Sequence, residues 1–302
     1  MTDQVPSGAV VVGCDGSWQS LRSVAAATRE AAARGAALVL LALARPRPAD
    51  RLAELREAES AAVAEATATV KHAVTVARAS RPEVRVEALV VRSWQDHRLE
   101  GLARTATLLV LGSHGRGGQA AFSLGSASGD LVRLLRVPVL VAGEPGSPHL
   151  AGPERTRARV KVGYRPSTDH LELLRVAARE AALRQTGLEV VAATGSAAHG
   201  AVARVQHAVW RDIDALPDCA GIPLHVLVID APVVTALLLG TRPGDLVVVG
   251  TRGGGTLAGL VAGSVARAVL DASPSDVMVV PPSACCAREL MAGSATQSLS
   301  IG

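Results

Sequence analysis

Two glycine-rich segments have the residue types and spacing of a phosphate-binding loop. Residues 108–126 read LLVLGSHGRGGQAAFSLGS, and residues 246–264 read LVVVGTRGGGTLAGLVAGS. Because glycine has no Cβ, its backbone N–H groups can approach phosphate oxygens closely, and a helix that begins at the final serine adds the positive end of its dipole. The alternative is structural, because glycines and a capping serine also make a tight connection from a strand to a helix.

Other phosphate and catalytic motifs do not fit. No lysine follows these glycines, so the Walker A pattern is absent. A GxGxxA pattern occurs in both segments, but it follows the fourth apolar run rather than the first, which disfavours a dinucleotide site. Neither GxSxG nor HExxH occurs. The sequence leaves enzymatic activity open, and slow ATP hydrolysis is the most that it supports.

The two segments belong to a duplication. Their offset of 138 residues extends to Val139-Leu140-Val141 and Val277-Met278-Val279, and the starts VVVG and VKVG, at residues 10–13 and 160–163, are offset by 150. Repetition of this length indicates two copies of one domain. We predict domains at residues 1–148 and 149–302, with a Pro- and Gly-rich linker over residues 144–159.

Each half alternates apolar runs with helical patterns. In the first half the runs are residues 10–13, 37–44 and 84–91, then one run on either side of the glycines; the second half repeats them at 160–163, 188–194 and 223–229. Nearly continuous Val and Leu strands are typical of a parallel sheet covered on both faces. The pattern predicts an α/β fold with two doubly wound domains.

At this point the motifs identify a family. The spacing G-x2-G-x9-G-[ST] resembles the nucleotide-binding signature of the universal stress proteins, and the opening VVVGCDGS, with Asp15 after the first strand, is similar to the start of that family. The resemblance covers roughly residues 8–143 and 157–281. It implies five parallel strands in the order 3-2-1-4-5 in each half, helices on both faces, and ATP binding where the glycines are kept.

The resemblance also implies roles for individual residues. Asp15 would accept a hydrogen bond from the adenosine part, Leu43 would meet adenine through its backbone, and Gly112 would approach the ribose. Asp15 has an alternative as a turn residue or helix cap. The phosphates would be held by the rest of the first loop, with Mg²⁺ helping to neutralise them. The matching residues are Gly115, Gly125, Ser126 and Ala127 in the first half and Gly250, Gly253, Gly263, Ser264 and Val265 in the second.

The second half departs from the pattern at one position. Arg165 stands where the first half has Asp15. A guanidinium cannot accept a hydrogen bond, and its charge requires an anion or an acidic neighbour. We therefore expect one nucleotide per chain, in the first half, with a second pocket that holds a ligand differently or holds none.

Composition limits the classes of function that remain possible. The 302 residues include one Phe, one Tyr and three Trp, and the net charge is +4. So few aromatic side chains argue against base-stacking nucleic-acid binding, and His225, Asp230 and Pro232 interrupt the longest apolar run, which argues against a membrane span. Four cysteines without a CxxC pattern predict reduced thiols in a cytoplasmic protein. The tail with Cys285 and Cys286 has no assigned role.

Three hypotheses follow for function. The first is an ATP-binding stress-response regulator whose occupancy is read by an unidentified protein partner; the others are an interaction scaffold without nucleotide and a weak ATPase. The fifth strands, residues 137–142 and 276–280, would leave apolar edges uncovered. We expect them to pair within the chain as a pseudo-dimer, with a homodimer as the alternative.

Overall fold

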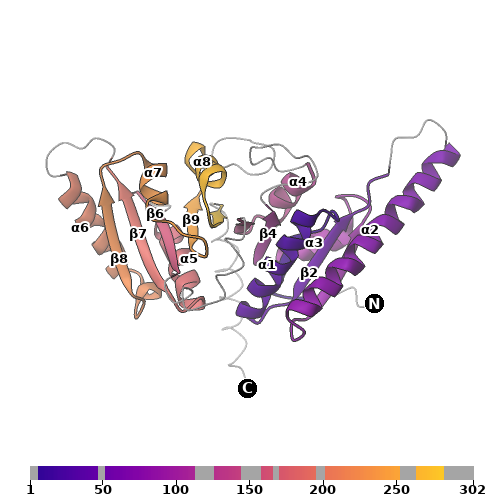
Figure 1. Cartoon of the computed structure of the whole chain (residues 1–302), viewed down its shortest axis with the longest axis horizontal. Coiled ribbons are helices and arrows are strands. Elements are labelled where there is room, and N and C mark those ends of the chain that lie inside the picture. The colour runs from indigo at the N-terminus through magenta and orange to yellow at the C-terminus, as the bar shows by residue number, and fades with distance from the viewer. Residues whose placement is uncertain are drawn as a thin grey trace, which may run out of the picture. The chain divides into compact units, whose positions relative to one another are not determined.

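The computed structural model describes residues 6–46, 52–112, 126–143, 158–165, 170–194, 201–251 and 263–281. Two compact units make up this part of the chain, the first built mainly from residues 6–143 and the second mainly from residues 158–281 (Figure 1). The boundary predicted at residues 148 and 149 falls outside the described residues and stays a prediction, as does the pairing of the two fifth strands.

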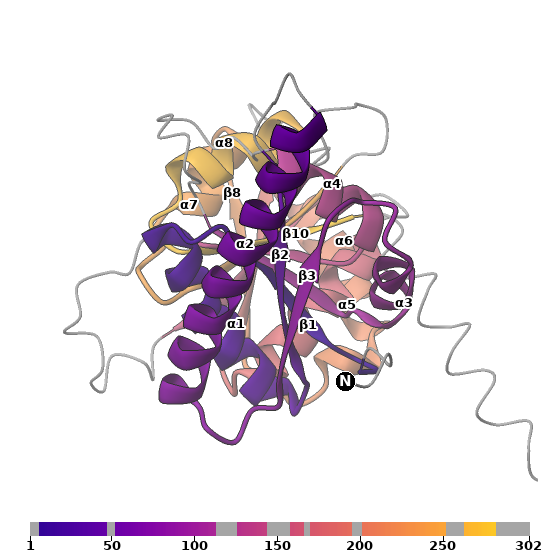
Figure 2. The same ribbon diagram turned by 90° about the vertical axis from the view of Figure 1, so that its right-hand side faces the viewer.

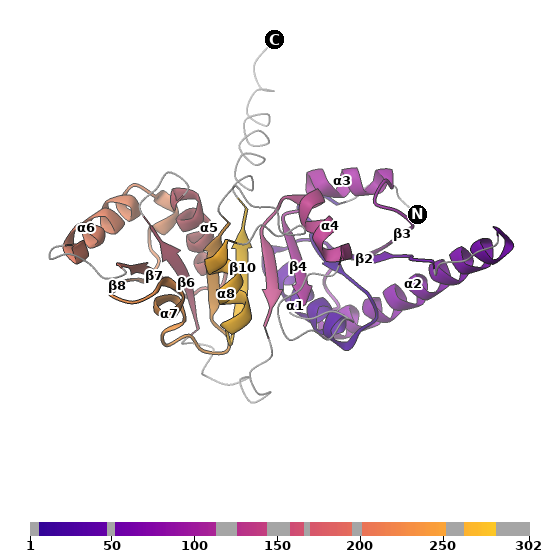
Figure 3. The ribbon, with the colours of Figure 1, turned by 90° about the horizontal axis from the view of Figure 1, so that it is seen from above.

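The first unit is a five-stranded parallel sheet with two helices on each face. Its strands lie in the order β3-β2-β1-β4-β5, and every neighbouring pair is parallel. Helices α1 and α2 cover one face, and α3 and α4 cover the other (Figure 3). The elements are β1 (Val10–Gly13), α1 (Trp18–Arg34), β2 (Leu38–Leu43), α2 (Leu52–Ser80), β3 (Val86–Val91), α3 (His97–Thr105), β4 (Leu108–Gly112), α4 (Ser126–Leu135) and β5 (Val139–Ala142).

The second unit repeats this plan. Its strands lie in the order β8-β7-β6-β9-β10, which is again third, second, first, fourth and fifth, and all pairs are parallel. The predicted doubly wound α/β fold is therefore confirmed. The elements are β6 (Arg159–Tyr164), α5 (His170–Leu183), β7 (Gly187–Ala193), α6 (Ala201–Asp214), the 3-10 turn η2 (Pro217–Cys219), β8 (Leu224–Ile229), α7 (Val233–Leu238), β9 (Leu246–Gly250), α8 (Ser264–Ala272) and β10 (Asp276–Val280).

The core is built from small and branched apolar side chains, as the scarcity of aromatic residues requires. The residues of β1 before Gly13 are completely buried, and β2 is buried along almost its whole length. Strands covered on both faces need such continuous apolar runs. Helices α2 and α3 lie on opposite sides of β3 (Figure 2), the outer strand of the first unit, whose residues are mostly half-buried.

Local signals set the ends of α1. The hydroxyl of Ser17 accepts a hydrogen bond from the N–H of Ser20 and caps the first turn. At the other end Gly35 adopts a left-handed backbone with φ of 59°, and its N–H closes the last turn on Ala31 and Ala32. The start of α1 is thereby held directly beyond β1, where the predicted site lies.

The second unit has a buried ion pair at a position where the first unit has two valines. Lys161 on β6 lies opposite Glu189 on β7, with 3.0 Å between Nζ and Oε1, and both residues are buried. The Lys161 ammonium also donates to the carbonyl of Leu239 at 2.6 Å and to the hydroxyl of Thr241 at 3.2 Å. At the same place in the first unit, buried Val11 lies opposite buried Val39. One duplicated position thus carries an apolar pair in one unit and a charged pair in the other.

The apolar stretch from Leu224 to Gly240 forms a strand and a short helix. Residues 224–229 are β8 and residues 233–238 are α7. Within the part of the chain that the structure describes, no helix is both long and apolar enough to cross a membrane.

Candidate functional site

Strands β1 and β4 lie side by side at the centre of the first unit. Val10 and Val12 of β1 are in register with Leu108 and Val110 of β4. The chain leaves β1 toward β2 and returns through β4 on the other side, so the segments that follow β1 and β4 leave the sheet at the same carboxyl edge. This is the switch point at which doubly wound sheets bind their ligands.

Asp15 follows β1 and shapes the turn into α1. Its Oδ1 accepts the N–H of Ser17 at 2.9 Å and the hydroxyl of Ser17 at 2.6 Å. Between them Gly16 has a φ of 76°, a conformation that glycine adopts without strain. The turn role is therefore present, and Ser17 rather than Asp15 caps the helix. The Asp15 carboxylate is nevertheless exposed at the carboxyl edge.

Cys14, beside Asp15, is not a nucleophile at neutral pH. Its side chain is buried, and burial together with the charge of Asp15 raises the pKa of the thiol to about 12. Since the thiolate is the reactive form, this cysteine packs as a small apolar side chain.

The structure places the described residues of the first loop at the same edge. Gly112 ends β4, and Ser126 and Ala127 begin α4, whose N-terminal N–H groups are those that a phosphate would meet. Leu43 ends β2 and is half-buried, in register with Val91 of β3. Gly115 and Gly125 lie outside the described residues.

The second unit presents the same framework. Gly250 ends β9, Gly263 precedes the first turn of α8, and Ser264 and Val265 are its first two residues. Gly253 lies outside the described residues. Arg165, exposed directly after β6, occupies the place that Asp15 has after β1.

Comparison with known proteins supports one family. The model of the universal stress protein family matches residues 7–143 and 156–281, most of both units. The chain belongs to the universal stress protein family. Its role therefore falls within the stress response. The two matches to the family model correspond to the two units of the chain.

Individual relatives agree with this assignment. The chain is 46% identical over 67 residues to Universal stress protein Mb2019 of Mycobacterium bovis, a match that covers 22% of this chain and 21% of that protein. A universal stress protein from Archaeoglobus fulgidus has the same fold, with a TM-score of 0.64 and 18% identity over 91% of this chain and 99% of that chain. A putative universal stress protein from Pseudomonas aeruginosa has a TM-score of 0.57 and 19% identity over 96% of this chain and 99% of that chain.

The carboxyl end of β6 differs from that of β1 at a second position, directly before Arg165. Tyr164, the single tyrosine of the chain, stands where β1 is followed by Cys14. Its ring is buried, and its hydroxyl donates to Oδ2 of Asp212 on α6 at 2.7 Å. Burial and this hydrogen bond raise the pKa of the phenol. A phenol tied to α6 thus replaces a thiol at the carboxyl edge, so the two units differ in shape as well as in charge.

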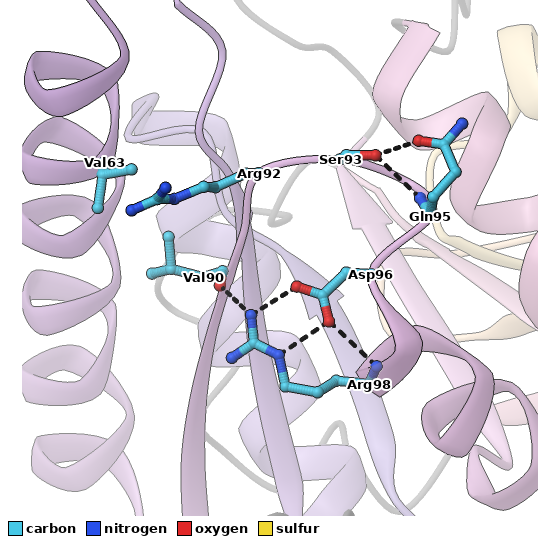
Figure 4. A pocket seen from close by; sticks show the side chains of 7 residues that line it. All are labelled: Val63, Val90, Arg92, Ser93, Gln95, Asp96 and Arg98. Atoms are coloured by element: carbon cyan, nitrogen blue, oxygen red, sulfur yellow. Dashed lines mark hydrogen bonds and ion pairs between the residues drawn. The ribbon is translucent and has the colours of Figure 1, made fainter. Parts of the chain in front are cut away.

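Motif reasoning missed a pocket at the outer strand of the first unit. Its cavity has a volume of about 470 Å³, large enough for a small molecule. None of its lining residues was predicted. The pocket lies at the same carboxyl edge, one strand beyond Leu43. Val91 of β3 is in register with Leu43, and its neighbours in the chain, Val90 and Arg92, line the pocket. The lining, drawn in Figure 4, comes from α2, β3, the segment between β3 and α3, and the first turn of α3; it consists of Val63, Val90, Arg92, Ser93, Gln95, Asp96 and Arg98.

An ion pair closes one side of this pocket. Oδ1 of Asp96 accepts the backbone N–H of Arg98 at 3.0 Å and caps α3, while the Arg98 guanidinium donates to both carboxylate oxygens, at 2.9 and 2.6 Å (Figure 4). The same guanidinium donates to the carbonyl of Val90 at 2.9 Å. These hydrogen bonds, those of the Arg98 side chain first, lower the pKa of Asp96 to about 2.

Asp96 should therefore make stability depend on pH. A folded pKa below the usual 3.8 stabilises the fold above about pH 4, and this contribution is lost as pH falls toward 2. We expect Asp96→Ala to lower the free energy of unfolding at pH 7 by about 1 kcal/mol, the usual value of a lost helix cap. Urea titrations should show a smaller loss for Asp96→Asn, which keeps a capping oxygen, and that loss should shrink below pH 4. A loss independent of pH would contradict this prediction.

No group of three or more His, Cys, Asp or Glu side chains within the described ranges is placed to bind a metal ion.

Proposed function

We propose that the first unit binds ATP at the carboxyl edge of β1 and β4 and that the protein is an ATP-binding regulator within the stress response. The proposal rests on one observation: Asp15 and Gly112 both lie at the switch point. Helix α4 begins at Ser126, the serine that ends the family's glycine spacing. In this arrangement a hydrogen-bond acceptor lies on one side and backbone donors lie on the other.

The proposed contacts follow from the residues that come after β1, β2 and β4 at the carboxyl edge. Asp15 accepts a hydrogen bond from the adenosine part, and Leu43 is near adenine at the end of β2. Gly112 approaches the ribose. The phosphates meet the N–H groups of Ser126 and Ala127 together with the glycines at positions 115 and 125. Mg²⁺ neutralises part of the phosphate charge, because the loop contains no lysine.

The chemistry at this edge favours binding over catalysis. Cys14 is buried and protonated at neutral pH, and Asp15 accepts hydrogen bonds from Ser17. We propose that occupancy by ATP changes a surface that a protein partner reads, and that any hydrolysis is slow. A cytoplasmic location is part of this proposal.

Calorimetric titration of the full chain with MgATP tests the proposal. We expect saturable binding and a higher melting temperature, since a ligand that binds only the folded state stabilises it by mass action. The nucleotide released by denaturing the purified protein identifies what occupies the site in cells. Phosphate release is measured against a protein-free control and against Asp15→Ala.

The outcomes separate the three hypotheses. Binding without phosphate release supports the regulator, and phosphate release that Asp15→Ala removes supports the weak ATPase. Neither heat nor a melting shift at millimolar MgATP, together with no nucleotide in the denatured protein, would show that the glycine loops are only structural.

A further inference from the structure

A guanidinium lies fixed beside the proposed site, on the first helix of the first unit. Arg22 on α1 packs over the indole of Trp18 one turn earlier, with its Cζ 5.2 Å from the ring centroid. Its Nη2 also donates to the carbonyl of Gly143 at 2.9 Å. A cation–π contact and a hydrogen bond from different elements hold the half-buried side chain in one orientation.

The hydrogen bond places this cation at the carboxyl edge. Gly143 directly follows β5, whose last residue, Ala142, is in register with Gly112 of β4. Helix α1 packs against β1 and β4. The Arg22 guanidinium therefore lies at the end of the sheet where the chain leaves β4, the same end at which Asp15 follows β1.

Arg22 keeps donors for a ligand. A guanidinium has five N–H donors, and within the described part of the chain Gly143 supplies its one hydrogen-bond acceptor. Trp18, whose indole shields one side of this cation, is 64% exposed at the first position of α1.

The duplication reverses both charges. At the offset of 150 residues, Asp15 corresponds to Arg165 and Arg22 corresponds to Glu172. The first unit thus has an acid after its first strand and a base on the next helix, whereas the second has the base first and the acid second. Glu172 is paired with Arg175 on its own helix. A polyanion beside α5 would meet a carboxylate where the first unit offers a guanidinium.

We propose that Arg22, oriented by Trp18, binds the phosphate end of the ligand in the first unit. Arg22 is then the residue by which the first unit, rather than the second, binds a polyanion. This inference rests on the proposed function and deepens it. Arginine and phosphate form charge-assisted hydrogen bonds that are frequently bidentate. Arg22 then adds a fixed cation to the backbone donors of the loop, whereas Glu172 at the same place in the second unit has no N–H donor for the ligand in its side chain.

Affinity for a series of ligands tests this assignment. Adenosine, AMP, ADP and ATP are titrated into the wild type, Arg22→Met and Arg22→Lys. In the wild type, affinity should rise with each phosphate. In Arg22→Met the affinity for ATP should fall about tenfold or more, the usual effect of losing a hydrogen bond to a charged group, while adenosine binds as before. Arg22→Lys, which keeps a point charge, should recover part of the loss.

Two matched variants control for charge and for the indole. Arg29→Met removes the same charge from an exposed position farther along α1 and should leave the whole series unchanged. Trp18→Leu should weaken ATP binding less than Arg22→Met does, since it removes the orientation and keeps the cation. A merely structural role of Arg22 would weaken adenosine and ATP equally, and that result would overturn the proposal.

Inorganic tripolyphosphate keeps this test independent of the proposed function. If the wild type binds tripolyphosphate and Arg22→Met binds it about tenfold more weakly, the assignment of Arg22 holds even if ATP fails to bind. If the wild type does not bind tripolyphosphate, or if both proteins bind it equally, the assignment of Arg22 is wrong. Failure of ATP alone, with tripolyphosphate bound through Arg22, would instead refute the proposed function.

Discussion

Lys161→Met is expected to lower the free energy of unfolding of the second unit by about 3 kcal/mol, because it leaves a buried carboxylate without its closest ammonium. In the native protein the Lys161 ammonium has three partners: Glu189, the carbonyl of Leu239 and the hydroxyl of Thr241. In the variant, the partner that remains to Glu189 among the described residues is the outer guanidinium of Arg159, at 2.7 Å. The loss should be among the largest of any single substitution in this unit.

The first unit supplies the matched control for this substitution. Its corresponding pair is Val11 and Val39, so the double variant Lys161→Val with Glu189→Val copies a solution that the chain already uses. Replacing a buried ion pair by apolar residues of suitable volume is often neutral or stabilising. We expect the double variant to regain most of the stability that Lys161→Met loses.

Urea unfolding with a unit-specific probe measures both effects. Trp210 lies in the second unit, and the other tryptophans, Trp18 and Trp94, lie in the first. Replacing those two by Phe leaves Trp210 as the reporter of the second unit. A double variant no more stable than Lys161→Met, or a single variant within about 0.5 kcal/mol of the parent, the scatter expected of a neutral surface change, would refute the assigned role of the pair.

Asp15→Ala is expected to reduce the affinity for ATP by a factor of ten to a hundred, whereas Arg165→Ala should leave ATP binding unchanged. Losing one hydrogen bond to a charged acceptor costs about 1.5 to 3 kcal/mol. The Asp15 carboxylate also receives two hydrogen bonds from Ser17, so part of the loss could come from a rearranged turn. Asp15→Asn, which keeps an acceptor for both Ser17 donors, separates the two causes.

The two Asp15 variants distinguish a carboxylate that binds the ligand from one that only shapes the turn. If the carboxylate itself holds the ligand, Asp15→Asn should bind ATP nearly as weakly as Asp15→Ala while melting like the wild type. If the turn alone matters, Asp15→Asn should bind like the wild type. Full affinity in Asp15→Ala would show that recognition lies elsewhere, and weaker ATP binding in Arg165→Ala would point to the second unit.

The fold could be predicted because its signals are local and are repeated. Val and Leu runs separated by helical patterns specify a covered parallel sheet in each half, and the glycine spacing marks the same strand twice. The order of the strands came from the resemblance to a family, and the structure confirms it. The convergence of Asp15 and Gly112 followed from that order, since both residues come directly after strands that are neighbours.

The residues that prediction missed depend on contacts between elements. Arg22 resembles any charged residue of an amphipathic helix until its hydrogen bond to Gly143, 121 residues away, places it at the edge. Lys161 reads as one polar residue in an apolar run, and its register with Glu189 appears only when β6 pairs with β7. The pocket beside β3 is formed by α2 and a short turn whose sequence carries no motif.

The number of ATP molecules bound per full-length chain, measured by calorimetry in the wild type and in Asp15→Ala, tests the central proposal most directly. Because both units keep the glycine spacing, phosphate-binding capacity alone would give two. With Asp15 and Arg22 beside one site and Arg165 and Glu172 beside the other, we expect one molecule per wild-type chain and binding that is ten to a hundred times weaker in Asp15→Ala. Two molecules per wild-type chain, or one still bound by Asp15→Ala with unchanged affinity, would contradict the assignment of the nucleotide to the first unit.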